Sequence, residues 1–328
     1  MRSALQFIGK MLFPAMTVLA VLAAAPSAWS QQYPTKPVRI VAPFAPGGGT
    51  DFIARLIAQK LTAALGQQFV VDNRPGAGGT LGTEIGVKSA PDGYTLTMIA
   101  ASYTVNPSLY KLKFDPANDI SAVILIDKGP FLVVVHPSMP VKNVKDLIAL
   151  AKAKPGEINY ATSGQGSIVH MATELFLNMA GIKMTHIPYK GTGPALTDTI
   201  SGQTTLLFGS IASTLPYTKS GRLRPIAVTT AKRIPAEPGI PSIAESGVPG
   251  YDVTNWHGLI GPKGMPRSIV DRVNSEVAKI IKQKDMEKQL QGDGLSADGG
   301  PAEEFQQRIR REIDQWKKVV AQSGIKLN

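Results

Sequence analysis

The chain has 328 residues, no cysteine, and 35 Lys and Arg side chains against 24 Asp and Glu, a formal net charge of +11. The absence of cysteine excludes disulfides, thiolate catalysis and cysteine-based zinc sites. The length allows two domains. The basic residues are scattered and form no run interleaved with aromatic residues, so we do not expect nucleic acid to be a partner.

The first thirty residues have the pattern of a secretory signal peptide. Arg2 and Lys10 form a positive segment, residues 11–25 are apolar, and residues 28–30 offer small side chains for cleavage. The apolar stretch is too short to span a bilayer comfortably, and no later stretch approaches a membrane span. We therefore expect an exported, soluble chain that is cut after Ser30.

Next comes a strand, a glycine-rich turn and a helix. Residues 38–41 predict a buried strand, and apolar residues recur at helical spacing over residues 52–65 until Gly66 ends the helix. The glycines at 47–49 leave the first amides of this helix, which begins near Thr50, open to a ligand. Because these amides lack partners and the helix dipole is positive there, the junction predicts a site for a carboxylate or phosphate.

The same pattern follows a second time, with a strand at residues 69–71, a glycine loop at 72–80 and a helix at 81–87. Two such units predict a parallel sheet with both loops at one edge, where ligands bind. Turns and packing alone would explain either loop, but two adjacent loops favour a ligand. A third strand at residues 94–99 leads to Ser102, which is a candidate ligand contact or a helix cap.

The middle of the chain repeats this alternation. Gly129 and Pro130 separate two apolar strands, at residues 122–126 and 131–135, and residues 127–130 are expected to cross to a second domain. Four further strands, each followed by a small-residue loop or a turn, are then expected at residues 158–161, 184–189, 204–208 and 224–229.

The last third begins with coil at residues 235–249, which are rich in proline. Residues 251–260 are extended and should cross back to the first domain. Two amphipathic helices follow, one entered after Pro266 and one after Pro301. Their apolar stripes require a domain to cover.

An enzyme would need a nucleophile, a base or a metal site, and the sequence supports none of them. The four histidines are too far apart to form a metal-ligand motif. A secreted hydrolase that uses Ser163 or Ser167 with His170 is the alternative hypothesis, although Ser-Gly-Gln-Gly-Ser is not the Gly-x-Ser-x-Gly elbow of hydrolases. Neither glycine loop completes a dinucleotide or nucleotide phosphate motif, so we expect no cofactor.

A series of motifs gives a family resemblance that covers the whole mature chain. They are Pro-Phe-x-Pro-Gly-Gly-x-Thr-Asp from Pro43, Asn-Arg-Pro-Gly-Ala-Gly-Gly from Asn73, Pro-Asp-Gly-Tyr-Thr-Leu from Pro91, Ser-Gly-x-Gly-Ser-x-x-His from Ser163 and Pro-Tyr-Lys-Gly from Pro188. In this order they resemble the Bug family, the extracytoplasmic solute receptors of tripartite tricarboxylate transporters.

The resemblance implies an α/β, two-domain type II periplasmic-binding-protein fold (a Venus flytrap), in which each domain is a β-sheet flanked by helices. Domain 1 would comprise residues 31–128 and 256–328, and domain 2 residues 129–255. It further implies a monomeric periplasmic receptor, not an enzyme, without cofactor or metal. This receptor would capture a small organic carboxylate, either a di- or tricarboxylate or an aromatic acid, and deliver it to a membrane permease.

In that family the two amino-terminal loops hold a ligand carboxylate largely through backbone amides, and loops of the second domain complete the site. The matching motif positions of this sequence are expected to contact the ligand, and Ser102 is added to them because it follows the third strand. The predicted ligand-binding residues are Phe44, Ala45, Gly47, Gly48, Thr50, Asp51, Gly78, Thr80, Ser102, Ser163, Gly166, Ser167, Tyr189 and Lys190. Two positions depart from the family pattern: Gly209 stands where many relatives have aspartate, and His257 where they have Phe or Tyr. Loss of that carboxylate disfavours ligands with an ammonium group.

Overall fold

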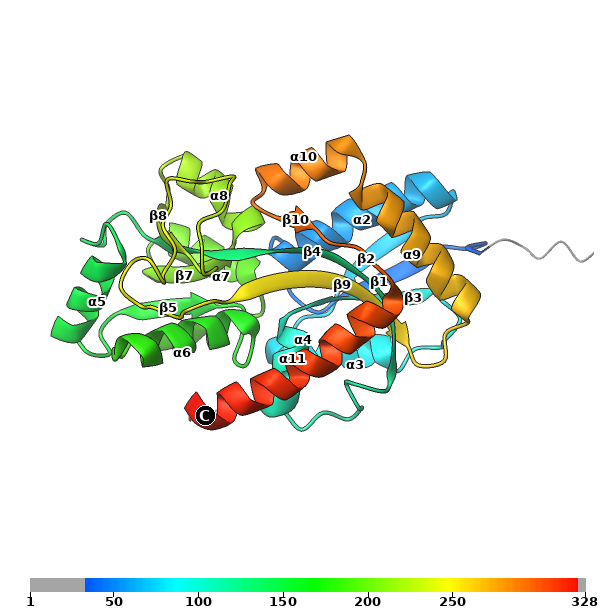
Figure 1. Ribbon diagram of the computed structural model, residues 1–328, viewed down its shortest axis with the longest axis horizontal. Coiled ribbons are helices and arrows are strands. Elements are labelled where there is room, and N and C mark those ends of the chain that lie inside the picture. The colour runs from blue at the N-terminus through cyan, green and yellow to red at the C-terminus, as the bar shows by residue number, and fades with distance from the viewer. Residues whose placement is uncertain (1–32, 324–328) are drawn as a thin grey trace, which may run out of the picture. The chain divides into compact units, whose positions relative to one another are not determined.

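The computed structural model describes residues 33–323, and the expected signal peptide lies outside them. In this part of the chain the strands form one ten-stranded mixed sheet (Figure 1). The strands are β1 (Val38–Ala42), β2 (Phe69–Asn73), β3 (Thr95–Ala100), β4 (Ile120–Val135), β5 (Asn159–Thr162), β6 (Thr185–Pro188), β7 (Leu206–Ser210), β8 (Arg224–Val228), β9 (Thr254–Pro262) and β10 (Ser296–Ala297).

Helices connect these strands and cover the sheet. They are α2 (Gly49–Leu65), α3 (Thr80–Val87), α4 (Ser102–Val105), α5 (Val144–Ala153), α6 (Ile168–Ala180), α7 (Thr192–Ile200), α8 (Ile211–Lys219), α9 (Arg267–Ile281), α10 (Lys284–Gly292) and α11 (Ala302–Ser323), with short 3-10 turns η1 (Ala77–Gly79) and η2 (Asn106–Ser108).

The predicted parallel arrangement of the first strands is confirmed. β1 lies between β2 and β3 and pairs with both in parallel. Its β-branched side chains are buried, as expected for a strand covered on both faces. The following helix α2 begins at Gly49, one residue before the expected start, and Gly66 ends it in the left-handed conformation at φ 70°. The glycine loops after β1 and β2 therefore share one sheet edge.

One long strand, β4, links the two halves of the sheet. Its first part pairs antiparallel with β9, up to the pair Pro130 and Thr254, and its last part, from Phe131, pairs with β7 and β8. The expected break at Gly129 and Pro130 is wrong, because the strand continues through both residues. Proline has no backbone N–H group and cannot donate a hydrogen bond to a neighbouring strand. Pro130 is tolerated because β4 changes its partner strand at this residue, where a missing hydrogen bond costs least.

The second half of the sheet carries the expected small-residue loops. β5 pairs in parallel with β6 and with β7. The helices that follow these strands are α6, α7 and α8. As in the first half, parallel neighbours place the starts of the helices at one edge. The complete strand order is β2-β1-β3-β9-β4-β7-β5-β6, with β8 and β10 paired to β4.

The two carboxy-terminal amphipathic helices cover the crossing strands. α9 and α11 both pack against β4, and α9 also contacts α2. The ring of Phe305 meets that of Trp256 edge-on, with ring centroids 5.5 Å apart. The indole Nε1 of Trp256 donates a 2.8 Å hydrogen bond to Glu312, which fixes α11 to β9. The expectation that these helices cover a sheet is confirmed.

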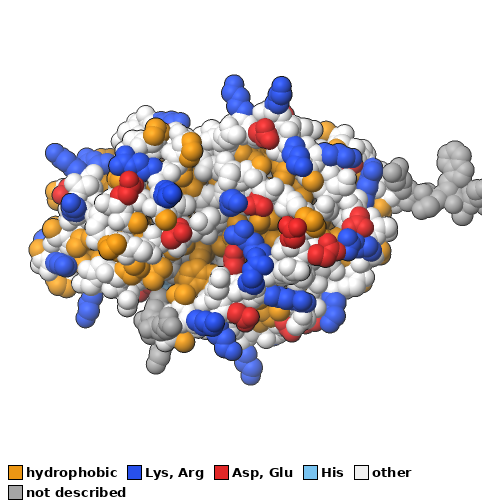
Figure 2. All heavy atoms as spheres, in the orientation of Figure 1, with side chains coloured by type: hydrophobic (Ala, Val, Ile, Leu, Met, Phe, Trp, Pro, Cys, Tyr) orange, Lys and Arg blue, Asp and Glu red, His pale blue; other side chains and the backbone are white. Residues whose placement is uncertain are grey.

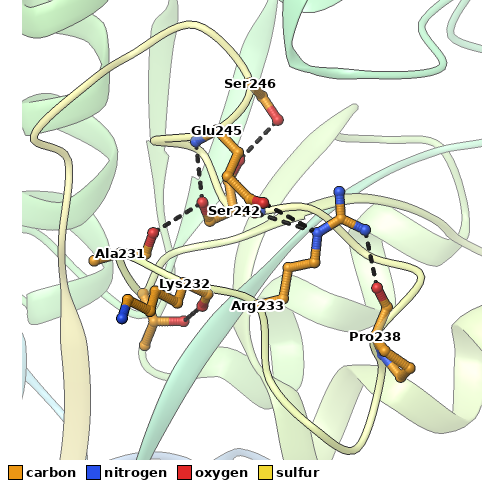
Figure 3. A network of polar contacts seen from close by, with 8 residues as sticks. Ala231, Lys232, Arg233, Pro238, Ser242, Glu245 and Ser246 are labelled. Carbon is orange, nitrogen blue, oxygen red and sulfur yellow. Dashed lines mark hydrogen bonds and ion pairs between the residues drawn. The ribbon is translucent and has the colours of Figure 1, made fainter.

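The proline-rich coil before β9 is held by a polar network (Figure 3). The Arg233 guanidinium pairs with Glu245 at 3.2 Å and donates to the carbonyl of Pro238 at 2.9 Å. The backbone N–H of Ser242 donates to the Glu245 carboxylate at 2.9 Å. This hydrogen bond, together with Arg233, lowers the pKa of Glu245. The loop therefore has a defined path without regular secondary structure.

On the face shown in Figure 2, basic and acidic side chains are interspersed, as the scattered charge pattern predicts. No helix within residues 33–323 is long and apolar enough to cross a membrane. In the same part of the chain, no three His, Asp or Glu side chains gather into a group that could hold a metal ion.

Candidate ligand-binding site

A cavity lies where the loops after β1, β5 and β7 meet the crossing strands β4 and β9. Its lining residues are small, apolar or hydroxyl-bearing, except for one amide and one imidazole. They are Phe44, Gly48, Gly49, Thr50, Ala100, Ser102, Phe131, Ser163, Ile168, Val169, Thr192, Ser210, Asn255 and His257.

Four helices of nine or more residues begin at this cavity. α2 contributes residues 48–50, α6 residues 168–169, α7 contributes Thr192, and Ser210 immediately precedes α8. The first amides of a helix lack intrahelical partners, and each helix start is equivalent to roughly half a positive charge. None of the described residues lining the cavity is Lys or Arg. Anion binding here would therefore rest on backbone amides and neutral side chains.

The start of α2 leaves no room for a side chain. A Cβ atom on Gly49 would lie 2.7 Å from the Cβ of Ser210 and 3.6 Å from the Nε2 of His257. Three elements, α2, β7 and β9, therefore converge on one point of the cavity wall. Only glycine fits there, because any larger residue would push Ser210 away.

Asp51 supports the first glycine loop. Its carboxylate accepts hydrogen bonds from the Gly47 amide at 3.1 Å and the Asn73 side chain at 2.9 Å, and it pairs with Arg55 at 3.0 Å. Burial opposes the charged carboxylate, but the hydrogen bonds from Arg55, Gly47 and Asn73 outweigh it and lower the pKa of Asp51. An ionised Asp51 thus fixes the turn that precedes α2.

Loops from the two halves of the sheet touch across the cavity. The Ala45 N–H donates to the Lys190 carbonyl at 2.9 Å. The Tyr110 hydroxyl donates to the Gln165 carbonyl at 2.6 Å, and a Cβ on Gly78 would lie 2.6 Å from the same oxygen. These contacts hold the loops of the two halves together.

The sequence comparisons identify the family. The family model for "Tripartite tricarboxylate transporter family receptor" matches residues 53–325. The chain belongs to this receptor family. It is 34% identical to the protein BugT of Bordetella pertussis over 302 residues, which cover 90% of this chain and 91% of BugT. The resemblance to the Bug family is confirmed.

Solved structures of receptors in this family agree with the fold. R. palustris Rpa4515 with adipate has a TM-score of 0.87 and 38% sequence identity, and the match covers 90% of this chain and 99% of that one. MatC from Rhodopseudomonas palustris with bound malate has a TM-score of 0.84 and 30% identity, covering 88% and 100%. The periplasmic binding protein BugD has a TM-score of 0.87 and 31% identity, covering 90% and 99%. The expected periplasmic-binding-protein fold is confirmed.

The structure distributes the predicted site residues over three environments. Those that line the cavity are Phe44, Gly48, Thr50, Ser102 and Ser163. Ser163 also lines an outer groove of about 720 Å³, together with Gly78, Tyr189 and Lys190. The others line neither space and are Ala45, Gly47, Asp51, Thr80, Gly166 and Ser167.

Several residues of the third group hold the loops by hydrogen bonds. Thr80 donates to the Ala77 carbonyl at 3.0 Å, and Ser167 caps α6 by accepting from the His170 N–H at 3.2 Å. Ser102 has a similar second role, since its hydroxyl accepts from the Ile168 N–H at 3.0 Å. It therefore occupies one open amide of α6 rather than capping its own helix.

The site residues that sequence reasoning missed fall into two groups. Gly49, Thr192 and Ser210 each stand at a helix start after a strand and a small-residue loop, so the pattern that found Gly48 could have found them. Asn255 and His257 lie in the middle of the crossing strand β9. His257 stands out in the sequence only as a departure from the family pattern, and no local signal places either residue in the cavity, because their place depends on how β9 pairs with distant strands.

The hydrolase alternative is not supported. The Ser167 hydroxyl accepts from a backbone amide of α6, and the His170 ring accepts the Gly166 N–H at Nδ1, 3.2 Å away. The His170 ring stacks on His186, with ring centroids 4.1 Å apart. Burial and the neighbouring His186 lower the pKa of His170 to about 3. This histidine is a buried neutral group that supports the loop at Gly166.

The stacked histidines predict an acid-sensitive fold. Burial also lowers the pKa of His186 to about 4. Below the ordinary histidine pKa of 6.5 the unfolded chain takes up protons that folded His170 and His186 do not, so stability is lost as pH falls from about 6.5 toward 4. We expect this pair to remove about 4 kcal/mol between neutral pH and pH 5, about 2 kcal/mol for each histidine, measured by urea denaturation.

Carboxylates also weaken folds in acid, so variants must isolate the contribution of these histidines. The double variant His170→Gln/His186→Gln should show a flatter pH dependence than the wild type, whereas His136→Gln, at a half-buried loop position, should not. An unchanged slope in the double variant would contradict this assignment.

A second prediction concerns how the anion is held. Gly48 has an extended backbone, φ −94° and ψ 173°, so Gly48→Val adds no backbone strain, yet its Cβ would lie 3.3 Å from that of Thr192. We expect this variant to lose calorimetrically detectable binding while its far-ultraviolet circular dichroism stays native. Arg74 is 54% exposed and pairs with Asp72, so Arg74→Ala should weaken binding by less than about fivefold.

The ligand for this measurement is whichever of adipate, malate or citrate binds the wild type most tightly. The opposite result, with Arg74→Ala losing all affinity and Gly48→Val binding normally, would mean that a salt bridge holds the carboxylate.

Proposed function

We propose that this receptor captures a small di- or tricarboxylate, or an aromatic acid, in the cavity at the starts of α2, α6, α7 and α8 and delivers it to a membrane permease. The observation that carries the proposal is the convergence of these helix starts on a cavity whose described lining residues include no Lys or Arg. Relatives of the same family were solved with adipate and with malate, which supports the same ligand class here.

Charge balance favours an acid with more than one carboxylate. Four helix starts at roughly half a positive charge each are together equivalent to about two charges. A dicarboxylate would therefore be nearly neutralised in the cavity without any cationic side chain. A monocarboxylate would leave part of this positive potential unbalanced, so we expect it to bind more weakly unless aromatic packing against Phe44 and Phe131 compensates.

The proposed receptor works in the periplasm as a monomer after removal of residues 1–30. Its two domains would comprise residues 31–128 with 256–328, and residues 129–255. β4 and β9, which pair from Ile120 to Pro130, are the proposed hinge between them. The hydrogen bonds from Ala45 to Lys190 and from Tyr110 to Gln165 would form as the domains close on a ligand.

The ligand class can be tested by thermal shift and calorimetry with the mature chain. The panel contains acetate, benzoate, succinate, malate, adipate and citrate. At about one hundred times its dissociation constant, a true ligand adds roughly 2.7 kcal/mol of stability. We expect at least one di- or tricarboxylate to raise the melting temperature, and acetate to have no effect. If no acid of the panel shifts it, the proposed ligand class is wrong.

Domain closure can be tested by small-angle scattering. We expect the radius of gyration to fall when the acid that shifts the melting temperature most is added at saturation. A matched control is Tyr110→Phe, which removes the hydrogen bond from Tyr110 to the Gln165 carbonyl. This variant should bind the acid more weakly and still close. Identical curves with and without the acid would argue for a rigid pocket.

A further inference from the structure

A buried pair of titratable residues stands behind one wall of the cavity. Asp127 in β4 and His257 in β9 are cross-strand neighbours, and the His257 Nδ1 lies 2.9 Å from an Asp127 carboxylate oxygen. Their side chains are 0% and 1% exposed. His257 itself lines the cavity, while Asp127 lies behind it. A hydrogen bond at this distance requires that Nδ1 carry the proton, because the carboxylate only accepts.

The same wall contains acceptor atoms without partners among the described residues. Asp127 uses one carboxylate oxygen for His257, and its other oxygen, Oδ2, has no hydrogen bond. Asn255 lines the cavity beside His257, with its amide nitrogen Nδ2 3.3 Å from the His257 Nε2, and its amide oxygen Oδ1 is buried without a partner. Buried acceptors without donors are costly, so this wall either meets a ligand or is arranged differently.

Charge decides between these arrangements. With a neutral His257, the buried Asp127 would be an uncompensated negative charge immediately behind an anion-binding cavity. Burial of an unpaired carboxylate is costly, and its field would oppose the binding of an acid. With His257 protonated at both ring nitrogens, the pair is neutral overall and Nε2 becomes a donor.

A protonated His257 also accounts for Asn255. The two ends of an asparagine amide have nearly the same shape, so its orientation follows from the hydrogen bonds around it. Turning this amide places Oδ1 against the Nε2–H of His257 and removes the unpartnered buried oxygen. The amide N–H groups then point where Oδ1 had been, so donors replace an unpartnered acceptor at that place.

We propose that Asp127, His257 and Asn255 act as one neutral, hydrogen-bond-donating wall that makes this receptor select acids without an ammonium group. The inference rests on the proposed function. Asp127 places a carboxylate behind the wall, and it is His257 that prevents Asp127 from attracting a cation. A ligand ammonium group at this wall would face donors, and no uncompensated carboxylate would attract it.

The protonation of His257 can be measured without any ligand. The chain has four histidines, and a proton–nitrogen correlation spectrum of their side chains reports whether each ring nitrogen carries a proton. His257→Gln removes one set of signals and so assigns it. We expect both ring nitrogens of His257 to be protonated at neutral pH in the wild-type protein. A bare Nε2 would overturn the proposal.

Ligand selection is tested with matched acids and their amino derivatives. The pairs are succinate with aspartate, and adipate with 2-aminoadipate, with malate as the hydroxyl analogue of the C4 acids. Wild-type protein should bind each amino derivative at least about tenfold more weakly than its parent acid. Equal or tighter binding of the amino derivative would overturn the proposal.

Two variants separate charge from shape. His257→Gln leaves Asp127 uncompensated and should shift the preference toward the amino derivative by about tenfold. The double variant Asp127→Asn/His257→Gln has no buried charge and should restore the preference for the parent acid. If both variants prefer the parent acid as strongly as the wild type, His257 does not set selectivity.

Failure of the proposed function gives a different result from failure of this inference. If no acid of either pair binds the wild type, the proposed ligand class fails, and the ring-nitrogen spectrum still decides whether His257 compensates Asp127. If His257→Gln does not fold, the variants His136→Gln, His170→Gln and His186→Gln assign the His257 signals by elimination, and the wild-type spectrum and the wild-type acid pairs remain decisive.

Discussion

Backbone N–H groups at helix starts are the polar groups on which the cavity depends. They provide positive potential without the entropy and hydration that a lysine or arginine side chain would bring. Several helix starts can meet only where the preceding strands all end. A parallel sheet has such an edge, and each half of the sheet contains one. Gly48 and Gly49 line the cavity at such a helix start and place no side chain between it and the backbone.

The strands that link the halves of the sheet also carry the wall of the site. β4 and β9 pair along most of their length and connect the elements that supply α2 with those that supply α6, α7 and α8. Asp127 and His257 occur where these strands are paired, so their contact is independent of the loops. The linking elements therefore serve recognition as well as connection.

Sequence patterns predicted the parts of the fold that local physics determines. The strand, glycine loop and helix at residues 38–65 follow from spacing and capping alone, and the structure reproduces them within one residue. The continuous path of β4 through Pro130 could not be predicted, because it depends on the strand changing partner there. His257 could not be placed for the same reason, since its partner Asp127 is 130 residues away in the chain.

Several motif residues hold the loops in shape, and this indicates which residues must make the site selective among acids. Asp51, Ser167 and His170 lie in the family motifs, yet their hydrogen bonds hold loops in shape. The amides at the helix starts bind any carboxylate equally, because a backbone N–H is the same whatever its side chain. Discrimination between acids of similar size must then come from side chains that line the cavity outside the loops. Asn255 and His257 on β9 are polar side chains in that position, and their hydrogen-bonding sense is set by the buried charge of Asp127 behind them.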